Sequence, residues 1–268
     1  MTTIVDANTN TNTQGVLIDK QSLSTQKVLT RGVIYVVYDA TGTNKFYNEC
    51  LYSIQTLKKH NPNLPVTVFS DINIKNDLID NIVLIPRNKV SLRCKTNYMY
   101  QSPYDKTLFL DTDTYINHNL DDMFVILDKY DMALAHDFSR KRNYVAAAIP
   151  EYNALPYAFS EFNTGVFLYK KCDATKKFFE LWDHYFNKYR HVMPYDQPSA
   201  RISFWESGAN IHTLPLEYNR RSKQNRLKSK RQKDDGKVGP EHLKTRIYHN
   251  HGLVNRTAED FDNEFHYV

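Results

Sequence analysis

Short apolar runs alternate with longer segments of helical periodicity over most of this chain. Apolar runs of strand length occur at residues 33–38, 64–70, 81–86 and 107–110. Residues 46–59 predict a helix, because apolar residues recur on one of its sides, and residues 92–101 predict a second one. Strands that alternate with helices favour an α/β fold, in which helices flank a mostly parallel, Rossmann-like central sheet.

The same alternation continues through the second half of the chain. Further strands are predicted at residues 132–135, 162–169 and 245–248. Residues 174–190 predict an amphipathic helix, and a short helix follows Tyr195, with Pro198 tolerated in its first turn. We therefore predict one domain over residues 27–268. Residues 1–26 are rich in Thr, Asn and Gln and are predicted to be a flexible N-terminal tail.

The composition is that of an ordinary globular protein, and it does not suggest a nucleic-acid partner. The chain is 41% hydrophobic and 24% charged, with a modest net charge of +5. Positive charge is concentrated at residues 220–233, within a predicted basic and mobile loop over 220–240. A solvated loop is the default role for this run. The alternatives are a lid, a contact for phosphate groups or an anionic acceptor, and a peripheral contact with a membrane.

Three widely spaced cysteines indicate a reducing compartment. Cys50, Cys94 and Cys172 match neither a disulfide framework nor a zinc-binding pattern. No apolar stretch reaches the roughly 18 residues that a membrane span needs, and the N-terminus lacks the pattern of a secretion signal. The chain is therefore expected to be cytoplasmic and to have no transmembrane segment.

Two carboxylates directly after the strand at 107–110 suggest a metal site. Asp111 and Asp113 project from the same face, with α-carbons about 6.6 Å apart at about 3.3 Å per residue, so one divalent cation can meet both. Ligands gather at the carboxyl ends of strands in open α/β sheets, which is where this pair would lie. The structural alternative is an ordinary turn or a helix cap.

Four short motifs occur in an order that is more specific than any one of them alone. They are Leu108–Thr114 with its continuation Asn119–Phe124, Phe162–Phe167, the pair Asp196-Gln197, and His249–Gly252. With Lys95 upstream, this series resembles family-8 glycosyltransferases, the retaining nucleotide-sugar enzymes that include glycogenin. The resemblance covers about residues 33–252 and implies a single GT-A-type domain.

The resemblance implies a metal-dependent enzyme that uses a nucleotide diphosphate sugar as donor, most often a UDP-sugar. Asp111, Asp113 and His249 would hold Mn²⁺ or Mg²⁺, since oxygen ligands with one imidazole suit these ions. His251 is the alternate ligand, and a surface or capping histidine is the structural alternative. Gly252 would let the backbone approach a phosphate group. The cation would neutralise the diphosphate as the sugar–oxygen bond breaks.

Other positions are assigned to the donor and the acceptor on the same basis. Residues assigned to sugar hydroxyls or to the acceptor are Asp137, Asn163, Asp196 and Gln197. Residues assigned to the rest of the donor site are Tyr38, Asp71, Lys95, Thr112 and Gly165. Tyr38 and Asp71 are the candidates for the base pocket. The structural alternatives are a helix N-cap for Asp196 and a helix-surface lysine for Lys95. The resemblance further implies a hexosyltransferase that retains configuration and acts on a hydroxyl of a glycan, a protein or a lipid-linked acceptor.

Two departures from the family pattern and two competing functions stay open. The first strand ends in Tyr38–Thr41, where the family has a Thr-Asn-Asp-type uridine segment, and the last motif carries a second histidine. An aspartate pair after a strand also resembles the first motif of haloacid-dehalogenase-type phosphatases, in which the first Asp is a nucleophile. Those enzymes place the motif near the start of the chain, whereas several strands precede Asp111 here. The other alternative is a catalytically silent module that binds nucleotide sugars.

Overall fold

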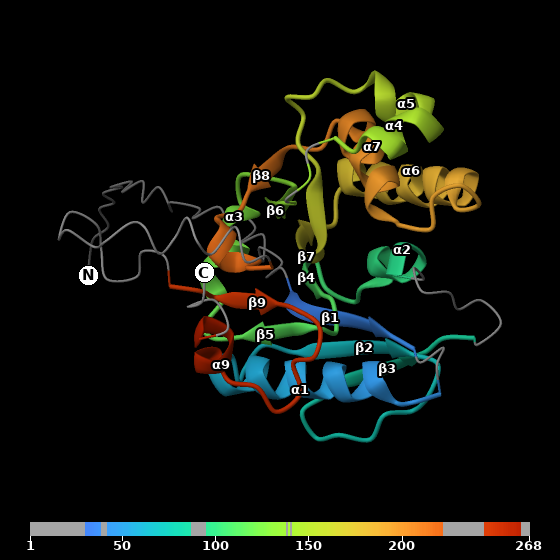
Figure 1. Ribbon diagram of the computed structural model, residues 1–268. Helices are drawn as coiled ribbons and strands as arrows, with labels where there is room; N and C mark the ends of the chain where they lie inside the picture. Colours follow the sequence, from blue (N-terminus) through green and yellow to red (C-terminus); the bar gives the residue numbers. More distant parts are fainter. Residues whose placement is uncertain are drawn as a thin grey trace, which may run out of the picture.

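The computed structural model of this chain describes residues 30–38, 42–86, 95–137, 139, 141–221 and 244–263. The predicted tail at 1–26 and most of the predicted basic loop at 220–240 lie outside these residues. Two sheets and the helices that cover them make up the described chain (Figure 1).

A seven-stranded sheet forms the centre of the molecule. In spatial order its strands are β3 (Asn81–Leu84), β2 (Val66–Ser70), β1 (Arg31–Val37), β4 (Lys106–Leu110), β7 (Phe162–Lys170), β6 (Met132–His136) and β8 (Ile211–Thr213). β7 pairs antiparallel with both β4 and β6, and the other neighbours pair in parallel. The predicted mostly parallel sheet is confirmed, with one reversed strand.

A separate two-stranded sheet brings the C-terminal part of the chain beside the two carboxylates. β5 (Thr114–Ile116) directly follows Asp113 and pairs antiparallel with β9 (Ile247–His249), so that Thr114 lies opposite His249. The last predicted strand, 245–248, therefore forms, but it belongs to this second sheet.

Helices cover both faces of the large sheet (Figure 1). They are α1 (Lys45–His60), α2 (Lys95–Tyr98), α3 (Asp121–Ile126), α4 (Asn143–Ala148), α5 (Pro150–Ala154), α6 (Asp173–Tyr189), α7 (Gln197–Ser207) and α9 (Ala258–Asn263). α1 and α3 pack on one face, and α6 and α7 pack on the other. None of the described helices combines the length and the apolar character needed to cross a bilayer.

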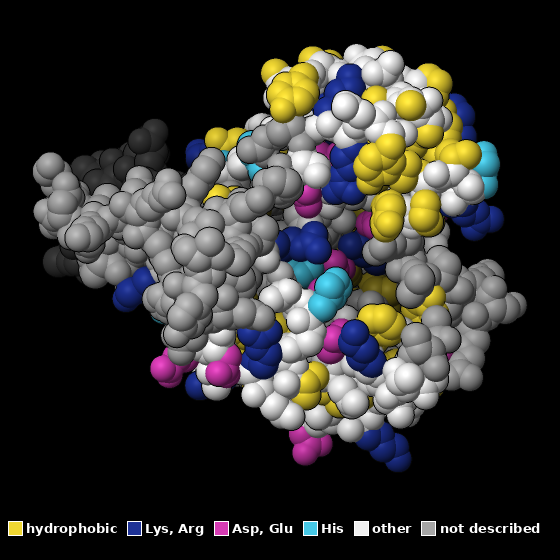
Figure 2. All heavy atoms as spheres, in the orientation of Figure 1, with side chains coloured by type: hydrophobic (Ala, Val, Ile, Leu, Met, Phe, Trp, Pro, Cys, Tyr) yellow, Lys and Arg dark blue, Asp and Glu magenta, His cyan; other side chains and the backbone are white. Residues whose placement is uncertain are grey.

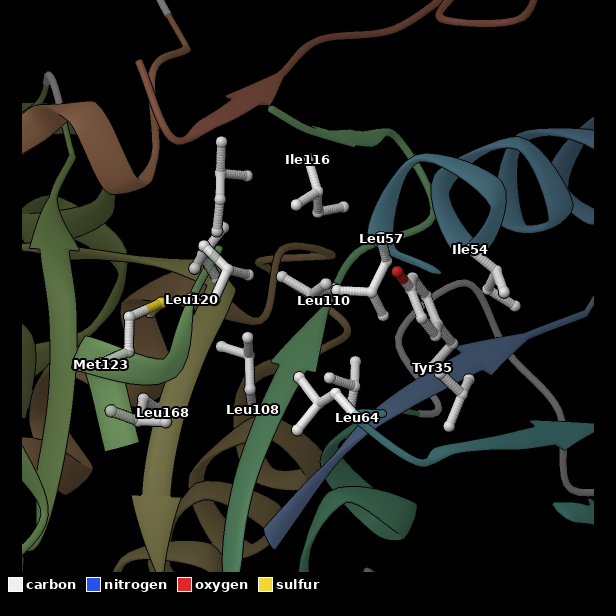
Figure 3. Packing of buried hydrophobic residues seen from close by; sticks show 14 of the residues in the cluster. Tyr35, Ile54, Leu57, Leu64, Leu108, Leu110, Ile116, Leu120, Met123 and Leu168 are labelled. Atoms are coloured by element: carbon white, nitrogen blue, oxygen red, sulfur yellow. The ribbon is translucent and has the colours of Figure 1, made fainter. Parts of the chain in front are cut away.

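Alternation along the strands divides the core into two layers. In β1, Val33 and Tyr35 belong to the layer under α1, whereas Ile34 between them belongs to the layer under α6. The first layer also holds Leu108 and Leu110 of β4 (Figure 3). Strands covered on both sides are continuously apolar, which explains the unbroken runs in the sequence. This packing fixes β4 and therefore the residues that follow it.

Candidate active site

A cleft of about 500 Å³ opens where several strands end. The C-terminal ends of β1 and β4 meet there, and the N-terminal end of β7 joins them because β7 runs in the opposite direction. The reversal places Asn163 and Gly165, near the start of β7, beside Asp111 at the end of β4. Histidine, basic and acidic side chains gather in a hollow on this face of the molecule (Figure 2).

Asp111, Asp113 and His249 converge in this cleft. One ligand atom of each lies within 4.8 Å of the others. His249 Nε2 is 3.2 Å from Asp113 Oδ1 and 3.7 Å from Asp111 Oδ2. Around an octahedral ion with bonds of 2.0–2.1 Å, neighbouring ligand atoms are about 2.9 Å apart. The distances in the cleft are only slightly longer, so small movements of these side chains would bring their ligand atoms around one cation. We refer to these three residues as the triad.

Two further observations fit a cation at the triad. His249 Nδ1 is 2.9 Å from Asn219 Oδ1, an acceptor, so Nδ1 donates there, and Nε2 is the ring nitrogen that a cation between the carboxylates would use. Gly165 leaves the necessary space: a Cβ there would lie 2.1 Å from His249 Cε1 and 2.5 Å from Asp111 Oδ2. Two carboxylates and one imidazole are a donor set that can hold a divalent cation.

Asp113 stays ionised in this cluster. Burial favours its neutral form, but His249 and His251 outweigh burial and hold the pKa of Asp113 well below its usual range. His251 Nδ1 is 2.8 Å from Asp113 Oδ2, and the hydrogen bond raises the pKa of His251. The side chain of His251 is 77% exposed, whereas that of His249 is buried. His251 thus contacts the triad from the solvent side.

Lys95 is a buried cation that joins the triad to the start of α7. Its Nζ donates to Asp111 Oδ1 at 3.1 Å and to Thr164 Oγ1 at 3.2 Å, and it lies 3.4 Å from Asp196 Oδ2. The ammonium group also lies over the ring of Phe109. Lys95 is therefore a cleft residue and not a helix-surface lysine.

Asp196 and Gln197 stand at the start of α7 and line the cleft. Asp196 occupies the N-cap position, but its carboxylate accepts a hydrogen bond from Thr164 Oγ1 at 3.2 Å and makes no side-chain cap of the helix. Gln197 Nε2 donates to Glu161 Oε1 at 2.6 Å. Both side chains are thus committed to contacts in and around the cleft.

Asn163 connects Asp137 with Gln197. Its Nδ2 lies 3.3 Å from Asp137 Oδ2 and 3.4 Å from Gln197 Oε1, and both of these atoms accept. Asp137 also pairs with Arg142 and Arg221, at 3.6 and 3.8 Å. The four side chains assigned to sugar and acceptor are therefore close together. We call Asp137, Asn163, Asp196 and Gln197 the sugar group.

The remaining assigned residues differ in how they relate to the cleft. Tyr38 and Thr112 line it. Gly252 is exposed, and its backbone has a φ of 74°. Its N–H donates a hydrogen bond to the carboxylate of Glu49. The carboxylate of Asp71 accepts a hydrogen bond from Tyr47 OH, and Asp71 is not among the described residues that line the cleft.

Other cleft residues were not singled out by the sequence motifs. Glu49 on α1 is 2% exposed, and burial, followed by the charge of Asp113, raises the pKa of its carboxyl group. Glu161 does not line the cleft itself: it is fully buried behind it and pairs with Arg142 Nη2 at 3.3 Å. An acidic residue directly before the Phe162-Asn163 motif was a usable signal for Glu161. Glu49 within a helical pattern and Arg142 in a connection offered none.

A family of known proteins matches this chain. The model of the family described as nucleotide-diphospho-sugar transferase matches residues 106–254, which is more than half of the sequence. The matched segment contains the triad, Asp137, Asn163, Asp196 and Gln197. No curated protein sequence gives a significant match.

Solved structures share the fold at low sequence identity. The galactosyltransferase LgtC, solved with donor and acceptor sugar analogues, has a TM-score of 0.54 at 14% identity, over 82% of this chain and 87% of LgtC. GlyE of Streptococcus pneumoniae has a TM-score of 0.54 at 18% identity, over 82% of this chain and 54% of GlyE. Mouse xyloside xylosyltransferase 1 has a TM-score of 0.54 at 12% identity, over 85% of this chain and 99% of the mouse chain. At these identities the likeness shows the fold alone.

Proposed function

Because this chain belongs to the nucleotide-diphospho-sugar transferase family and has the GT-A fold of its structural neighbours, we propose that it transfers a sugar from a nucleotide diphosphate to an acceptor hydroxyl. The observation that carries this proposal is the convergence of Asp111, Asp113 and His249 next to the buried Lys95. With a divalent cation at the triad, such a site suits a ligand with concentrated negative charge. The donor we expect is a UDP-sugar.

The triad would hold Mn²⁺ or Mg²⁺ in contact with the diphosphate. The cation supplies charge neutralisation of the leaving group without a proton transfer. Lys95 adds fixed positive charge on the side of Asp111 and Asp196. The negative charge that develops on the diphosphate is therefore met by groups that are already in place, which is the least costly way to stabilise it.

The sugar group would bind the transferred sugar and the acceptor. Its carboxylates accept hydrogen bonds from hydroxyl groups, and its amides can both donate and accept. Their mutual contacts limit how far each side chain can move, so the hydroxyl-binding atoms are preorganised. We expect a hexose, transferred with retention of configuration, with the acceptor hydroxyl attacking from the face that the diphosphate leaves.

For the acceptor we propose only a chemical class, a molecule with a free hydroxyl group, and for the cellular location we propose the cytoplasm. A glycan, a protein or a lipid-linked molecule would supply the hydroxyl group. For the basic run at 220–233 we propose a contact with anionic groups or with a membrane. Arg221, near the start of this run, lines the cleft. The residues of the run after Arg221 lie outside the described part of the chain. Cys50 and Cys172 are free thiols, which supports a cytoplasmic location. The family match supports sugar transfer rather than phosphatase chemistry, and the intact triad supports an active enzyme rather than a silent binding module.

Thermal unfolding with nucleotides tests the donor site. UDP, GDP, CDP and ADP are each added with Mn²⁺, with Mg²⁺ or with a chelator. A ligand at a hundred times its Kd stabilises the folded chain by about 2.7 kcal/mol. We expect a rise in Tm with UDP that requires the metal. No rise with any nucleotide, together with hydrolysis of an aryl phosphate, would instead indicate a phosphatase.

A variant pair separates the metal site from general effects of charge removal. Asp113→Ala should lose the metal-dependent rise in Tm and lose transfer, while the metal-free protein stays folded. Asp128→Ala, which removes an exposed carboxylate paired with Lys106, should keep both. Full transfer by Asp113→Ala would overturn the metal assignment. NMR of the product anomer then decides between retention and inversion.

A further inference from the structure

Asn219 is a buried side chain that lies behind the histidine of the triad. It follows the 3₁₀ turn Leu216–Tyr218 and is 3% exposed. Its Oδ1 is 2.9 Å from His249 Nδ1, and its Nδ2 donates to Asn163 Oδ1 at 2.9 Å. One amide therefore contacts a triad residue at one end and the sugar group at the other.

The orientation of this amide follows from a backbone group. Asn163 Oδ1 accepts the Gly165 N–H at 3.0 Å, and a backbone N–H can only donate. The atom of Asn163 that faces Asn219 is therefore an oxygen, so Asn219 must turn its NH₂ group toward it. Asn219 Oδ1 is then the atom that faces His249.

The same logic determines the tautomer of His249. An oxygen acceptor next to Nδ1 requires the proton on that nitrogen, so the neutral ring presents its lone pair at Nε2. Nε2 is the atom that faces the carboxylates of Asp111 and Asp113. The opposite tautomer would point an N–H at the cation and could not bind it.

On this basis, we propose that Asn219 is a positioning residue with two effects: it holds His249 in the metal-binding tautomer, and it orients Asn163 in the sugar group. With its Oδ1 occupied by Gly165 N–H and Asn219, Asn163 directs its Nδ2 toward Asp137 and Gln197. The metal side and the sugar side are thus joined through two amides. This inference rests on the proposed function, because it requires a divalent ion at the triad.

Two substitutions separate the two effects of Asn219. Asn219→Ala removes both contacts, and loss of the hydrogen-bond partner of a metal-binding histidine weakens metal affinity about 10–100-fold. Asn219→Asp keeps an acceptor for His249 Nδ1 but has no N–H for Asn163 Oδ1. We expect the Asp variant to bind Mn²⁺ about as tightly as the wild type. Its kcat/KM for the sugar donor should still fall, by about tenfold or more.

Calorimetric titration of each protein with Mn²⁺ alone measures the first effect, the affinity of the triad for the metal, without catalysis. Steady-state kinetics at saturating Mn²⁺ measures the second. Asn61→Ala is the matched control, because Asn61 is equally buried at 4% exposure but bonds the backbone of Leu57, His118 and Leu120. The control should lose stability in urea and keep its Mn²⁺ affinity.

The outcomes are distinct. Wild-type affinity for Mn²⁺ in Asn219→Ala would overturn the positioning role while leaving the proposed function intact. Equal losses of affinity in the Ala and Asp variants would also overturn it, because the acceptor oxygen would then be irrelevant. A wild-type chain that binds neither Mn²⁺ nor Mg²⁺ would remove the metal from the proposed function and the role of Asn219 with it. If Asn219→Ala does not fold, the Asp variant alone decides: loss of Mn²⁺ affinity in that variant contradicts the proposal.

Discussion

A methyl group at position 165 would fall inside the candidate metal site. The backbone of Gly165 cannot easily move away, because its carbonyl accepts the Asp111 N–H at 2.7 Å within the pairing of β4 and β7. The ring of His249, which the methyl group would meet, is held by Asn219. Glycine is needed here for close approach of the ligands and not for an unusual backbone conformation.

Gly165→Ala should therefore weaken Mn²⁺ binding about tenfold or more, because the displaced ring no longer presents Nε2 correctly. Calorimetric titration with Mn²⁺ measures the change. Val166→Ala in the same strand is the control: it removes two buried methyl groups and should cost about 2 kcal/mol of stability while leaving Mn²⁺ affinity unchanged. Unchanged affinity in Gly165→Ala would contradict a cation at the triad.

Part of the candidate site could be predicted from residues that are close in sequence and from the motif resemblance. Asp111 and Asp113 lie side by side because they are two positions apart after a strand, and the resemblance added His249 from the distant end. Glu49 and Arg142 reach the cleft only through the packing of a helix and a connection, so no short pattern marks them. Asp71 also follows a strand but is bonded to Tyr47.

At the scale of elements, α6 holds the start of α7 and therefore the position of Asp196. Trp182 of α6 is fully buried, and its Nε1 donates to the backbone carbonyl of Asp196 at 2.9 Å. The rings of Phe178 and Phe204 stack between the same helices, with centroids 4.4 Å apart. The indole hydrogen bond links this packing directly to a residue of the sugar group.

Trp182→Phe should lower both stability and activity. Loss of one buried hydrogen bond and part of a large ring costs roughly 1–3 kcal/mol, measured by urea unfolding. The carbonyl of Asp196 loses its partner, so we also expect kcat to fall. Phe178→Leu on the same helix should cost a similar amount of stability and leave kcat near the wild-type value. Equal kcat in the two variants would show that the indole does not position Asp196.

The contact of α5 with α6 makes stability depend on pH. Burial opposes ionisation of Glu151, but hydrogen bonds from Lys188 and Tyr189 prevail and lower the pKa of its carboxyl group to about 2. A lowered pKa in the folded chain stabilises it above the unfolded pKa, and this stabilisation is lost as pH falls toward 2. Glu151→Gln should thus lower Tm at pH 7 by about 1–2 °C, and the difference should shrink below pH 4.5. A pH-independent difference in calorimetric Tm would argue against this ion pair as the cause.

Long elements could be predicted from periodicity, and very short ones could not. The helices predicted at 46–59 and 174–190 agree closely with α1 (Lys45–His60) and α6 (Asp173–Tyr189). β5 and β8 have three residues each, and α4 and α5 have six and five. Such lengths contain too few repeats of either period to distinguish a strand or a helix from a connection.

At the scale of the whole molecule, the second sheet depends on a small aromatic cluster. Phe261 of α9 is fully buried against Tyr115 of β5 and Tyr248 of β9, with ring centroids 5.5 and 5.2 Å away. His249 directly follows Tyr248 in β9. Packing at the C-terminal helix therefore supports the strand that delivers the third triad residue.

Phe261→Ala should weaken Mn²⁺ binding although Phe261 does not line the cleft. A buried Phe→Ala change costs about 3–5 kcal/mol, and here the loss should loosen β9 in particular. Phe204→Ala, on the opposite face of the large sheet, removes the same volume and should leave Mn²⁺ affinity nearly unchanged. Calorimetric titration of both variants decides. Equal affinities would mean that the second sheet is held by other contacts.

The mostly parallel character of the large sheet was predictable, but its edge strand β8 and the direction of β7 were not. Alternating strands and helices favour parallel neighbours, and most neighbours are parallel. A continuous apolar run such as Phe162–Tyr169 reads equally well in either direction, so its pattern cannot reveal a reversal. The reversal matters for function because it brings Asn163 to the same edge as Asp111.

The pairing of β5 with β9 also has a consequence for the timing of biosynthesis. Asp113 is translated well before His249, and every strand of the large sheet has been translated before His249. The ribosome must release β9, and β9 must dock beside β5, before the three side chains can meet. A nascent chain can therefore form much of its core before the triad exists, and the assembled triad marks a molecule in which both sheets have formed.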